Sequence, residues 1–362
     1  MELAELMSLR PVPGAGVLLT VTGRCPLHCA HCSTASTMAS GEPGADQLLR
    51  FVGSFEGGGP AVVMLTGGEP LLRPALSAEL ARTARAAGTR SALLTGAFFA
   101  KGARSRSVPI PPPIMRAVTA VDHFSVSIDA FHEREVPRAD VFAVLRQALD
   151  AGVATSVHAV GSGPGDPYLA DVTADIRRTF DDRVPVLVNT LRAVGRAASW
   201  SAARAPGPAG RAVLPCAMAA WPVVAADGLV LACCNQDTVD RRPAPAHLTV
   251  GHIARDGWAA VAERVTASPA LRMIRTVGPS HLLHRYGTSG DGPQPGYCAG
   301  CRSLGDHPTV LAAADRLAGG AAGALLDAHV AHEQTAAGPV AFVRRHGADR
   351  YADLVALGGA PR

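Results

Sequence analysis

The sequence predicts an α/β fold, with a partial (β/α)6 barrel followed by a smaller cysteine-containing domain and a helical C-terminal tail. Three features predict it. Short apolar, β-branched segments alternate with helix-like segments as far as residue 191, which is typical of a parallel sheet covered by helices. The alternation gives way to an Ala/Gly/Pro-rich segment at 198–211, and cysteines recur beyond it. Ala-rich helical patterning dominates 308–357, so we predict domains at 1–205, 206–305 and 306–362.

Each barrel strand is predicted from a continuous apolar run that ends in glycine or polar residues. The strands are predicted at 16–22, 61–66, 91–95, 124–129, 155–160 and 185–191. Helices are predicted at 46–55, 75–87, 141–150 and 168–180, and the Arg/Ser/Pro-rich segment 101–113 is expected to be an exposed excursion. Because six units rather than eight are present, the TIM-like barrel should be open. A ligand site is expected at the carboxyl ends of its strands.

The second half of the chain has a different pattern. Apolar segments at 223–225 and 229–232 flank Asp227-Gly228 and predict a β-hairpin. Residues 257–277 are expected to pack as helix between this hairpin and the last cysteines. The helical tail matches no functional motif, and we expect it to cap either the barrel or the smaller domain.

Composition excludes several classes of protein. The 362 residues carry a net charge of +4 with basic residues scattered, which does not favour nucleic acid as a partner. No apolar run approaches the length of a membrane span, and the N-terminus lacks the order of a signal peptide. We therefore expect a cytoplasmic protein. In a reducing compartment, eight cysteines at motif spacings favour metal ligation over disulfides.

A group of three cysteines follows the first predicted strand. Cys25, Cys29 and Cys32 are separated by three and then two residues. Three thiolates so close can hold three irons of a 4Fe–4S cluster and leave the fourth iron without a protein ligand. An open position on a metal is a place for chemistry. A zinc site or buried apolar thiols are the competing interpretations of this spacing.

Together with Gly67-Gly68-Glu69-Pro70 after the second strand, this spacing resembles the radical S-adenosylmethionine (radical SAM) superfamily. The resemblance implies that the open iron binds S-adenosylmethionine and that one electron, from a flavodoxin- or ferredoxin-type reductant, yields a 5′-deoxyadenosyl radical. Gly67 and Gly68 would let backbone approach the ligand, and Glu69 would accept a hydrogen bond from its ammonium group. The family usually has an aromatic residue before the third cysteine. Here His31 stands there, and its imidazole would stack similarly near the adenine.

Further candidates follow later strands. The resemblance implies that Ser127 or Asp129 helps to hold the ribose or carboxylate of S-adenosylmethionine. His132 and Glu133 come next and are candidates for substrate contact or proton transfer, unless they lie in a solvated loop. Arg196 follows the sixth strand and is either a partner for a carboxylate of S-adenosylmethionine or substrate, or a surface arginine.

A second set of cysteines lies beyond the barrel. Cys216, Cys233, Cys298 and Cys301 resemble the SPASM/twitch extension, which holds auxiliary iron–sulfur clusters in radical SAM enzymes. Because no cysteine follows Cys301, the shorter twitch form with one fully ligated 4Fe–4S cluster is expected, suited to carrying an electron. A structural zinc site with four cysteine ligands is the competing interpretation. Cys234 is spare: it replaces Cys233 as the ligand, donates a hydrogen atom as in radical epimerases, or is a small buried hydrophobe.

The predicted activity is that of a radical SAM oxidoreductase or natural-product maturase. We expect it to tailor a ribosomally made peptide by oxidation, crosslinking or epimerisation. Only 24 residues precede Cys25, too few for a fused leader-peptide-binding domain. A peptide substrate is therefore expected to need a separate leader-peptide-binding protein or direct recognition by the barrel mouth. Dehydrogenation or epimerisation of a sugar or aminocyclitol is the alternative. A zinc-stabilised binding protein is the alternative that is not an enzyme.

Overall fold

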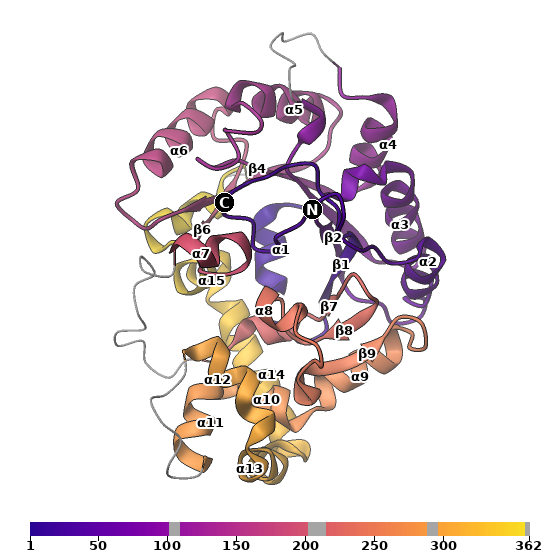
Figure 1. The fold of residues 1–362 in the computed structure, drawn as a ribbon, viewed down its shortest axis with the longest axis vertical. Coiled ribbons are helices and arrows are strands. Elements are labelled where there is room, and N and C mark those ends of the chain that lie inside the picture. Colours follow the sequence, from indigo (N-terminus) through magenta and orange to yellow (C-terminus); the bar gives the residue numbers. More distant parts are fainter. Residues whose placement is uncertain (101–108, 202–214, 288–295, 359–362) are drawn as a thin grey trace.

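A continuous sheet of nine strands runs through the computed structural model, which describes residues 1–100, 109–201, 215–287 and 296–358. The strand order is β6-β5-β4-β3-β2-β1-β7-β8-β9 (Figure 1). The first six strands are parallel to their neighbours, as the apolar runs predicted. They are β1 (Gly16–Thr22), β2 (Val62–Gly67), β3 (Arg90–Thr95), β4 (His123–Ser127), β5 (Thr155–Gly161) and β6 (Val186–Thr190). Each predicted strand is confirmed to within two residues at either end.

Helices cover the outer face of this half of the sheet, which confirms the partial barrel. They are α2 (Ala45–Gly53), α3 (Pro74–Ala86), α4 (Pro112–Ala120), α5 (Arg138–Asp150) and α6 (Pro167–Phe180). Helix α4 corrects the prediction for 101–113, since its first turn lies at the end of that segment; residues 101–108 are outside the described part. Proline is compatible with a helical first turn, where the N–H has no partner. Ile114 and Val118 of α4 are buried in the core.

The opposite face of these strands lines the inside of the barrel, and α1 (Leu3–Leu9) fills one end of it (Figure 1). Leu3 and Leu6 of α1 cluster with Val62 and Ala92, which lie near the starts of their strands. The helix therefore closes the amino-end of the barrel. The carboxyl ends of the strands, where the candidate site residues are expected, are left at the other end.

The sheet continues past β1 into the second half of the chain. Strand β7 (Val223–Val224) runs parallel to β1, and it pairs with β8 (Leu229–Leu231) in the antiparallel hairpin that the sequence predicted. Strand β9 (Thr249–His252) is the last strand of the sheet. The junction is tight at Gly16, where a Cβ would lie 2.5 Å from the Trp221 ring. The predicted boundary near residue 205 lies outside the described residues.

Short helices lie along the chain between β6 and the C-terminal segment. They are α7 (Ala198–Ser201), α8 (Gln236–Val239), α9 (Trp258–Ala267), α10 (Pro269–Thr276), α11 (Pro279–Tyr286) and α12 (Tyr297–Ser303). The helical segment predicted at 257–277 is present as two helices. It breaks where Pro269 starts a new first turn and the Ser268 hydroxyl accepts a hydrogen bond from the Leu271 N–H at 3.3 Å.

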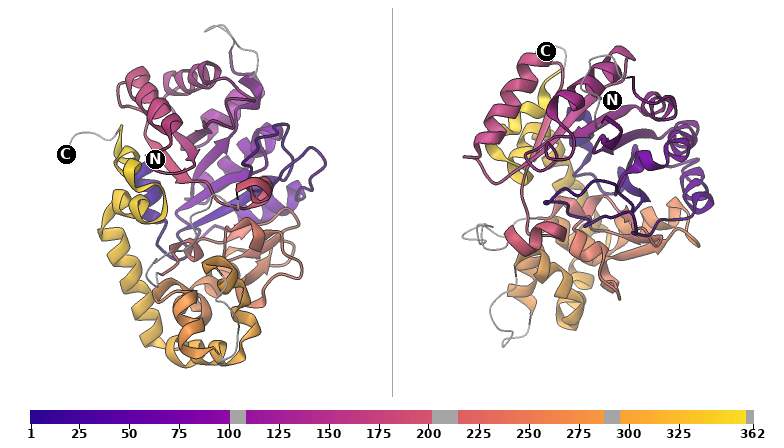
Figure 2. Two further views of the ribbon diagram at one scale, coloured as in Figure 1. Left: turned by 60° about the vertical axis from the view of Figure 1, so that its left-hand side comes forward. Right: turned by 45° about the horizontal axis from the view of Figure 1, so that its top comes forward.

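The C-terminal segment is helical, as predicted, and packs on both halves of the molecule. It comprises α13 (Pro308–Ala318), α14 (Ala321–Ala336), α15 (Gly338–His346) and the 3-10 helix η7 (Asp349–Ala356). Asp327 of α14 forms a buried ion pair with Arg275 of α10 at 2.6 Å. Farther along, the Ala348 N–H donates to the Val188 carbonyl of β6 at 2.9 Å. Figure 2 shows these yellow helices running along one side from the orange region to the barrel.

No single helix in the described residues is long and apolar enough to cross a membrane. Helices α13 and α14 pass a test of length and composition together, but they are bent by 87°.

Candidate functional site

The three cysteines of the first motif lie on the loop between β1 and α2. Cys25 and Cys29 are buried, and Cys32 is partly buried. The Cys32 N–H donates to the Cys29 carbonyl at 3.1 Å, and its sulfur lies 3.2 Å from the Thr34 hydroxyl. Burial, together with the nearby Glu69 carboxylate and the other two thiols, raises the pKa of Cys25 to about 12. A thiol in these surroundings becomes a thiolate only with a cation bound to it, so the donor set fits a metal cluster.

The glycines after β2 pack against this loop. Gly67 has a φ of +130°, and a Cβ there would lie 2.3 Å from the Thr22 carbonyl oxygen. A Cβ on Gly68 would lie 2.3 Å from the Arg24 carbonyl oxygen. The sequence predicted that these glycines approach a ligand. The structure gives them another use, because they let the end of β2 lie against the backbone that starts the cysteine loop.

Glu69 is fully buried beside the cysteine loop. Its carboxylate accepts hydrogen bonds from the Thr95 hydroxyl at 2.8 Å and the Gly96 N–H at 2.9 Å. Its backbone N–H donates to the Arg24 carbonyl at 2.8 Å. Burial raises the pKa of Glu69 above its usual range. A buried carboxylate of this kind gains most from a cationic partner, such as an ammonium group.

Asp129 lies between two imidazoles just beyond β4. Its Oδ2 atom is 3.1 Å from His31 Nε2 and 3.2 Å from His132 Nδ1. Burial alone would raise the pKa of Asp129, but the hydrogen bonds and charges of the two imidazoles hold it well below its usual range. Within the described residues, these three offer ligand atoms that all lie within 4.8 Å of one another, a spacing that can hold a metal ion.

His132 connects this cluster to the cysteine loop. Burial alone would lower the pKa of His132, but hydrogen bonds and charge from Asp129 and Cys29 raise it to about 10. Its Nε2 atom lies 3.2 Å from where a Cβ on Gly96 would stand, so Gly96 leaves room for this imidazole. The structure thus brings His132 to the cysteine loop, as expected for a residue at the barrel mouth.

Aromatic rings line the other side of His31. Its ring stacks on Phe131 with centroids 4.8 Å apart, and Phe131 in turn lies 5.4 Å from the Trp200 ring. The Trp200 indole N–H donates to the Ala30 carbonyl at 3.0 Å. The sequence predicted that His31 stacks near an adenine. In the structure one face of its ring is covered by Phe131.

Glu133 and Ser127 differ in their surroundings. The Glu133 carboxylate pairs with Arg138 and accepts a hydrogen bond from the Tyr168 hydroxyl at 2.8 Å. It therefore belongs to an ion-pair network above α5 and α6 rather than to the cysteine loop. Ser127 lies at the end of β4, opposite His158 of β5, and is partly exposed toward the inside of the barrel.

Arg196 binds the backbone of the cysteine loop. The guanidinium donates from Nε to the Cys29 carbonyl at 2.9 Å and from Nη1 to the Ser36 carbonyl at 2.7 Å. Gly195 has a φ of +55°, and a Cβ there would lie 2.2 Å from the Ser33 carbonyl oxygen. We expected either a carboxylate partner or a surface position for Arg196. In the structure these two nitrogens hold backbone carbonyls of the loop, and the carboxylate partner stays a prediction.

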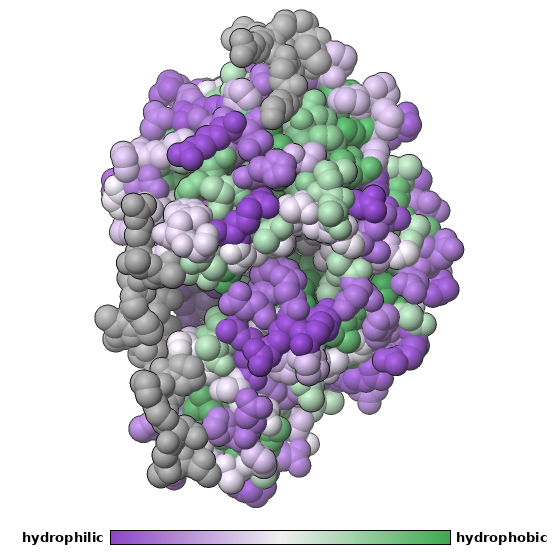
Figure 3. Space-filling model, in the orientation of Figure 1, coloured by the Kyte–Doolittle hydropathy of each residue, from purple (hydrophilic) through white to green (hydrophobic). Residues whose placement is uncertain are grey.

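Partly exposed side chains surround the open end of the barrel interior. Their side chains lie on the same face of the strands that packs against α1 at the other end of the barrel. These residues are Thr20, Thr66, Leu94, Ser127, His158, Val160 and Asn189. On the face seen in Figure 3, hydrophilic residues cover most of the surface, and apolar atoms show in a recess near the centre. The interior at this end offers hydroxyl, imidazole and amide groups to a ligand.

The second set of cysteines is assembled from three parts of the fold. Cys298 and Cys301 are three residues apart on α12 and share one of its faces. Cys301 lies within electrostatic range of Cys216 and Cys233. Cys216 lies within range of Cys298 and Cys234, and its backbone N–H donates to the Ile274 carbonyl of α10 at 3.0 Å.

Burial raises the pKa of these thiols, that of Cys216 to about 11. A set of buried and partly buried thiols that converge from three parts of the fold fits a bound metal or metal cluster. Tyr297 hydrogen-bonds to Cys216, and Arg192 and Arg302 lie near Cys298. The structure brings all five cysteines of this half of the chain together, and it places both Cys233 and Cys234 within reach of the set.

Comparison with known proteins identifies the barrel. Residues 19–175 match the family model of the radical SAM superfamily. This part of the chain is similar to a radical SAM domain. This match covers the first cysteine motif, the Gly67-Gly68-Glu69 segment and Asp129, and it agrees with the resemblance seen in the sequence.

Two curated proteins are similar to part of this chain. The AdoMet-dependent heme synthase of Methanosarcina barkeri is 34% identical over 113 residues, which is 30% of this chain and 29% of that protein. The GTP 3′,8-cyclase of Lactiplantibacillus plantarum is 27% identical over 149 residues, which is 39% of this chain and 42% of that protein. The chain thus spans less than half of the length of either relative.

The fold extends beyond the radical SAM domain. A crystal structure of Streptococcus suis SuiB bound to S-adenosylmethionine superposes with a TM-score of 0.50 and 12% sequence identity, covering 69% of this chain and 65% of that one. At this identity the comparison establishes a shared fold.

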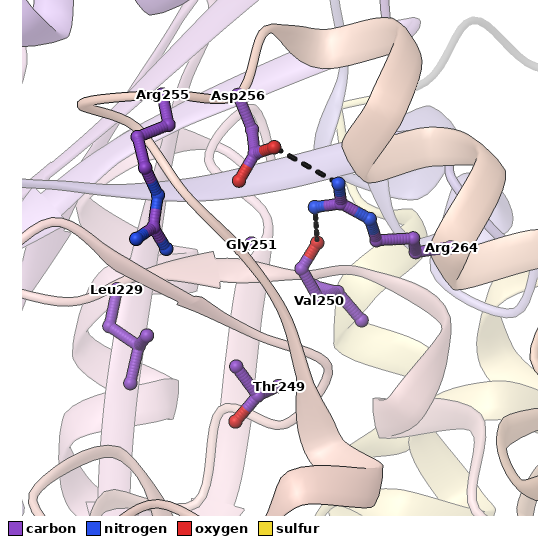
Figure 4. A pocket seen from close by; sticks show the side chains of 7 residues that line it. All are labelled: Leu229, Thr249, Val250, Gly251, Arg255, Asp256 and Arg264. Atoms are coloured by element: carbon purple, nitrogen blue, oxygen red, sulfur yellow. Dashed lines mark hydrogen bonds and ion pairs between the residues drawn. The ribbon is translucent and has the colours of Figure 1, made fainter.

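Outside the radical SAM domain there is also a shallow hollow of about 470 Å³ at the end of the sheet (Figure 4). The Arg264 side chain lines this hollow and donates hydrogen bonds to the Val250 carbonyl and to the Asp256 carboxylate, both at 3.0 Å. None of the sequence-predicted site residues lines it.

Proposed function

We propose that this protein is a radical SAM enzyme that uses S-adenosylmethionine to abstract hydrogen from an unactivated C–H bond. One observation carries the proposal: the three-cysteine loop lies against the buried carboxylate of Glu69, inside a domain that matches the superfamily. A 4Fe–4S cluster with S-adenosylmethionine, when bound, supplies a 5′-deoxyadenosyl radical. The protein supplies position, charge and exclusion of water.

Each group near the loop then has a task. Cys25, Cys29 and Cys32 would hold the cluster, and Glu69 would accept hydrogen bonds from the ammonium group of S-adenosylmethionine. Arg196 keeps the loop in shape by holding two of its carbonyls. Asp129 orients the imidazoles of His31 and His132, while Ser127 remains a candidate for hydrogen bonds to the ribose or carboxylate. The close pairing of both imidazoles with Asp129 favours this orienting role over a separate metal site.

The second set of cysteines would hold one auxiliary 4Fe–4S cluster. Cys216, Cys298 and Cys301, with Cys233 or Cys234, supply the four thiolates that such a cluster needs. This cluster would take up the electron left on the substrate, so that the overall reaction is an oxidation. If Cys233 is the ligand, Cys234 stays available to donate a hydrogen atom to the substrate radical, and the outcome would then be an epimerisation rather than an oxidation. The thiyl radical left on Cys234 would be restored to the thiol by a proton and an electron from the flavodoxin- or ferredoxin-type reductant.

The proposed substrate is a ribosomally made peptide, held at the mouth with the help of a separate leader-peptide-binding protein. The partly buried rings of Phe131 and Trp200 beside the loop support this choice, because aromatic rings suit peptide side chains. A sugar or aminocyclitol is the second candidate, favoured by the hydroxyl, imidazole and amide groups of Thr66, His158 and Asn189 at the open end of the barrel. A cytoplasmic reductant of the flavodoxin or ferredoxin type would serve either reaction.

The first experiment tests the chemistry. The purified chain is reconstituted anaerobically with iron and sulfide, reduced with dithionite and given S-adenosylmethionine. We expect about eight irons per chain, as for two 4Fe–4S clusters, and formation of 5′-deoxyadenosine. Cys25→Ala should form none. Cleavage by that variant at the wild-type rate would reject the assignment of the Cys25 loop as the cluster site. Zinc without sulfide in the native protein would reject the enzyme in favour of a zinc-stabilised binding protein.

The second experiment tests the substrate. Genes beside this one supply the candidates, either a short precursor peptide or enzymes of sugar or aminocyclitol synthesis. The peptide proposal predicts that the neighbouring peptide, deuterated at its reacting carbon, transfers deuterium to 5′-deoxyadenosine. Transfer from a deuterated aminocyclitol instead would replace the peptide by the second candidate. In heavy water, Cys234→Ala should stop any epimerised product while 5′-deoxyadenosine still forms; unchanged product would dismiss Cys234 as the donor.

A further inference from the structure

A buried arginine lies beside the second set of cysteines. Arg10 directly follows α1, and only 8% of its surface is exposed. Its Nη1 atom is buried and makes no hydrogen bond. No ion pair between Arg10 and a carboxylate is found among the described residues. The position is unlike that of Arg275, which is equally buried but forms an ion pair with Asp327 at 2.6 Å.

The neighbours of Arg10 compensate only part of its charge. The guanidinium lies over the Trp221 ring at 4.5 Å, and its Nη2 atom lies 3.3 Å from the Met218 sulfur. An aromatic face and a thioether are weak partners for a cation. A buried guanidinium with an unused N–H group is costly unless an anion is present. Burial accordingly lowers the pKa of Arg10.

The anion is indicated by what Arg10 faces. Its guanidinium lies within electrostatic range of the Cys234 and Cys216 thiols, and Met218, which it contacts, is two residues from Cys216. The two cysteines come from the two ends of the segment that carries the hairpin, and both lie in the second cysteine set. Arg192 and Arg302 approach the same set from the side of Cys298, but Arg192 is exposed and Arg302 lies 3.8 Å from Asp237. Arg10 is thus the most deeply buried of these three cations.

We propose that Arg10 is the internal counter-charge of the metal cluster held by the second cysteine set, and that it raises the reduction potential of this cluster. This inference rests on the proposed function, because it requires the auxiliary cluster. A 4Fe–4S cluster with four thiolates is an anion, and net charge and hydrogen bonds to sulfur set its potential. A fixed positive charge beside the sulfurs stabilises the reduced form, which carries one more negative charge.

The counter-charge also explains a feature of the chain order. Arg10 comes from the N-terminal segment, ahead of the radical SAM domain, and Trp221 beneath it bonds through its indole N–H to the Leu9 carbonyl at 3.0 Å. The segment after α1 therefore reaches the second cysteine set across the β1–β7 junction. Arg10 acts on the cluster through its charge and is a positioning residue rather than a catalytic one.

The test is a redox titration followed by electron paramagnetic resonance on the full reconstituted chain. Arg10→Met removes the charge and keeps an unbranched side chain, whereas Arg10→Lys keeps the charge. Arg192→Met is the matched control, since it removes an exposed cation near the same cysteines. The signal that S-adenosylmethionine perturbs belongs to the first cluster and is the internal reference. We expect the potential of the second cluster to become more negative in Arg10→Met and to stay close to wild type in Arg10→Lys and Arg192→Met.

A thermal measurement separates charge from packing. Reconstitution should raise the melting temperature of the wild type more than that of Arg10→Met, because part of the gain comes from pairing the cluster with Arg10. A purely structural arginine would lower the melting temperature of apo and loaded protein equally. Loss of the second cluster from Arg10→Met but not from Arg10→Lys would also support the role in charge compensation.

Three outcomes would overturn the proposal, and they can be told apart. Equal potentials and equal thermal gains in Arg10→Met and wild type would remove the role of Arg10 alone. Loss of the second cluster from both Arg10 variants would show that the shape of the side chain matters rather than its charge. A wild-type chain with only about four irons would remove the auxiliary cluster itself, and with it this role for Arg10.

Discussion

The two cysteine sites are built in opposite ways. The first lies on a single loop, with Cys25, Cys29 and Cys32 within eight consecutive residues. Neighbouring strand ends hold that loop from outside through Gly68, Glu69 and Arg196. The second is assembled from segments between residues 216 and 301, and its parts meet only because β7, β8, α10 and α12 pack together.

This difference decides what can disturb each site. A site on one loop keeps its ligands near one another even when distant parts of the protein loosen. A site assembled by packing depends on every element that positions a ligand. We therefore expect the second site to respond to changes far from its cysteines and the first site to respond mainly to changes in its own loop and in the strand ends around it.

The largest expected effect is on enzyme activity, and it should differ between variants of the two cysteine sites. Cys25→Ala should abolish cleavage of S-adenosylmethionine, whereas Cys298→Ala should leave cleavage intact and stop formation of the oxidised product. Product analysis and 5′-deoxyadenosine assays on both variants measure this. If Cys298→Ala also abolishes cleavage, the two sites are not independent and the comparison fails.

The next effect comes from the ion pair that fixes α10. Asp327→Ala would leave Arg275 buried without its partner, and we expect a loss of about 3–5 kcal/mol in the free energy of unfolding, measured by denaturant titration. Since α10 holds Cys216, the second site should lose iron before the first. Arg177→Ala, which breaks an exposed ion pair with Asp182, is the control and should change neither quantity measurably.

We expect low pH to reduce the free energy of unfolding of the barrel that carries the first site. His123 bonds to the Met1 carbonyl and the Ser156 hydroxyl, and burial lowers its pKa from 6.5 to about 4. The unfolded chain then binds this proton near pH 6.5 and the folded chain only near pH 4. Stability contributed by neutral His123 is therefore present above pH 6.5 and is lost as the pH falls, by up to roughly 3 kcal/mol.

His123→Phe tests that assignment. The free energy of unfolding of this variant should vary less between pH 7 and pH 4 than that of the wild type, because the proton-binding group is gone. The Ser156 hydroxyl keeps a partner in Ser125 at 2.9 Å. Identical pH profiles for the two proteins would assign the acid sensitivity to other groups.

The smallest expected effect concerns Arg196, which binds the backbone of the cysteine loop. Arg196→Ala removes two charge-assisted hydrogen bonds to loop carbonyls and should cost about 2 kcal/mol, since the side chain is partly exposed. The first cluster should be lost more readily on dialysis against a chelator, with the second unchanged. Equal loss of both clusters would contradict the proposed separation of the two sites.

The same contrast explains how much the sequence could predict. The strands were placed to within two residues because each is a continuous apolar run, and the first cysteine set was recognisable because its spacing is local. Arg10 was missed, since nothing in residues 1–14 marks a buried cation. The partners of Arg196 were missed as well, because backbone carbonyls leave no trace in a sequence. The break at Pro269 had a signal in Ser268-Pro269, a helix-capping pair.

The contacts of the two outer strands of the sheet affect how readily the protein pairs with other chains. At β6 the Val188 carbonyl is bonded by the Ala348 N–H, and at β9 the Val250 carbonyl and the His252 N–H are bonded by the side chains of Arg264 and Asp256. Exposed strand edges invite pairing with other chains and the growth of aggregates. Here three of the groups that a foreign strand would seek are occupied, so both margins of the folded sheet are covered in part by the chain itself.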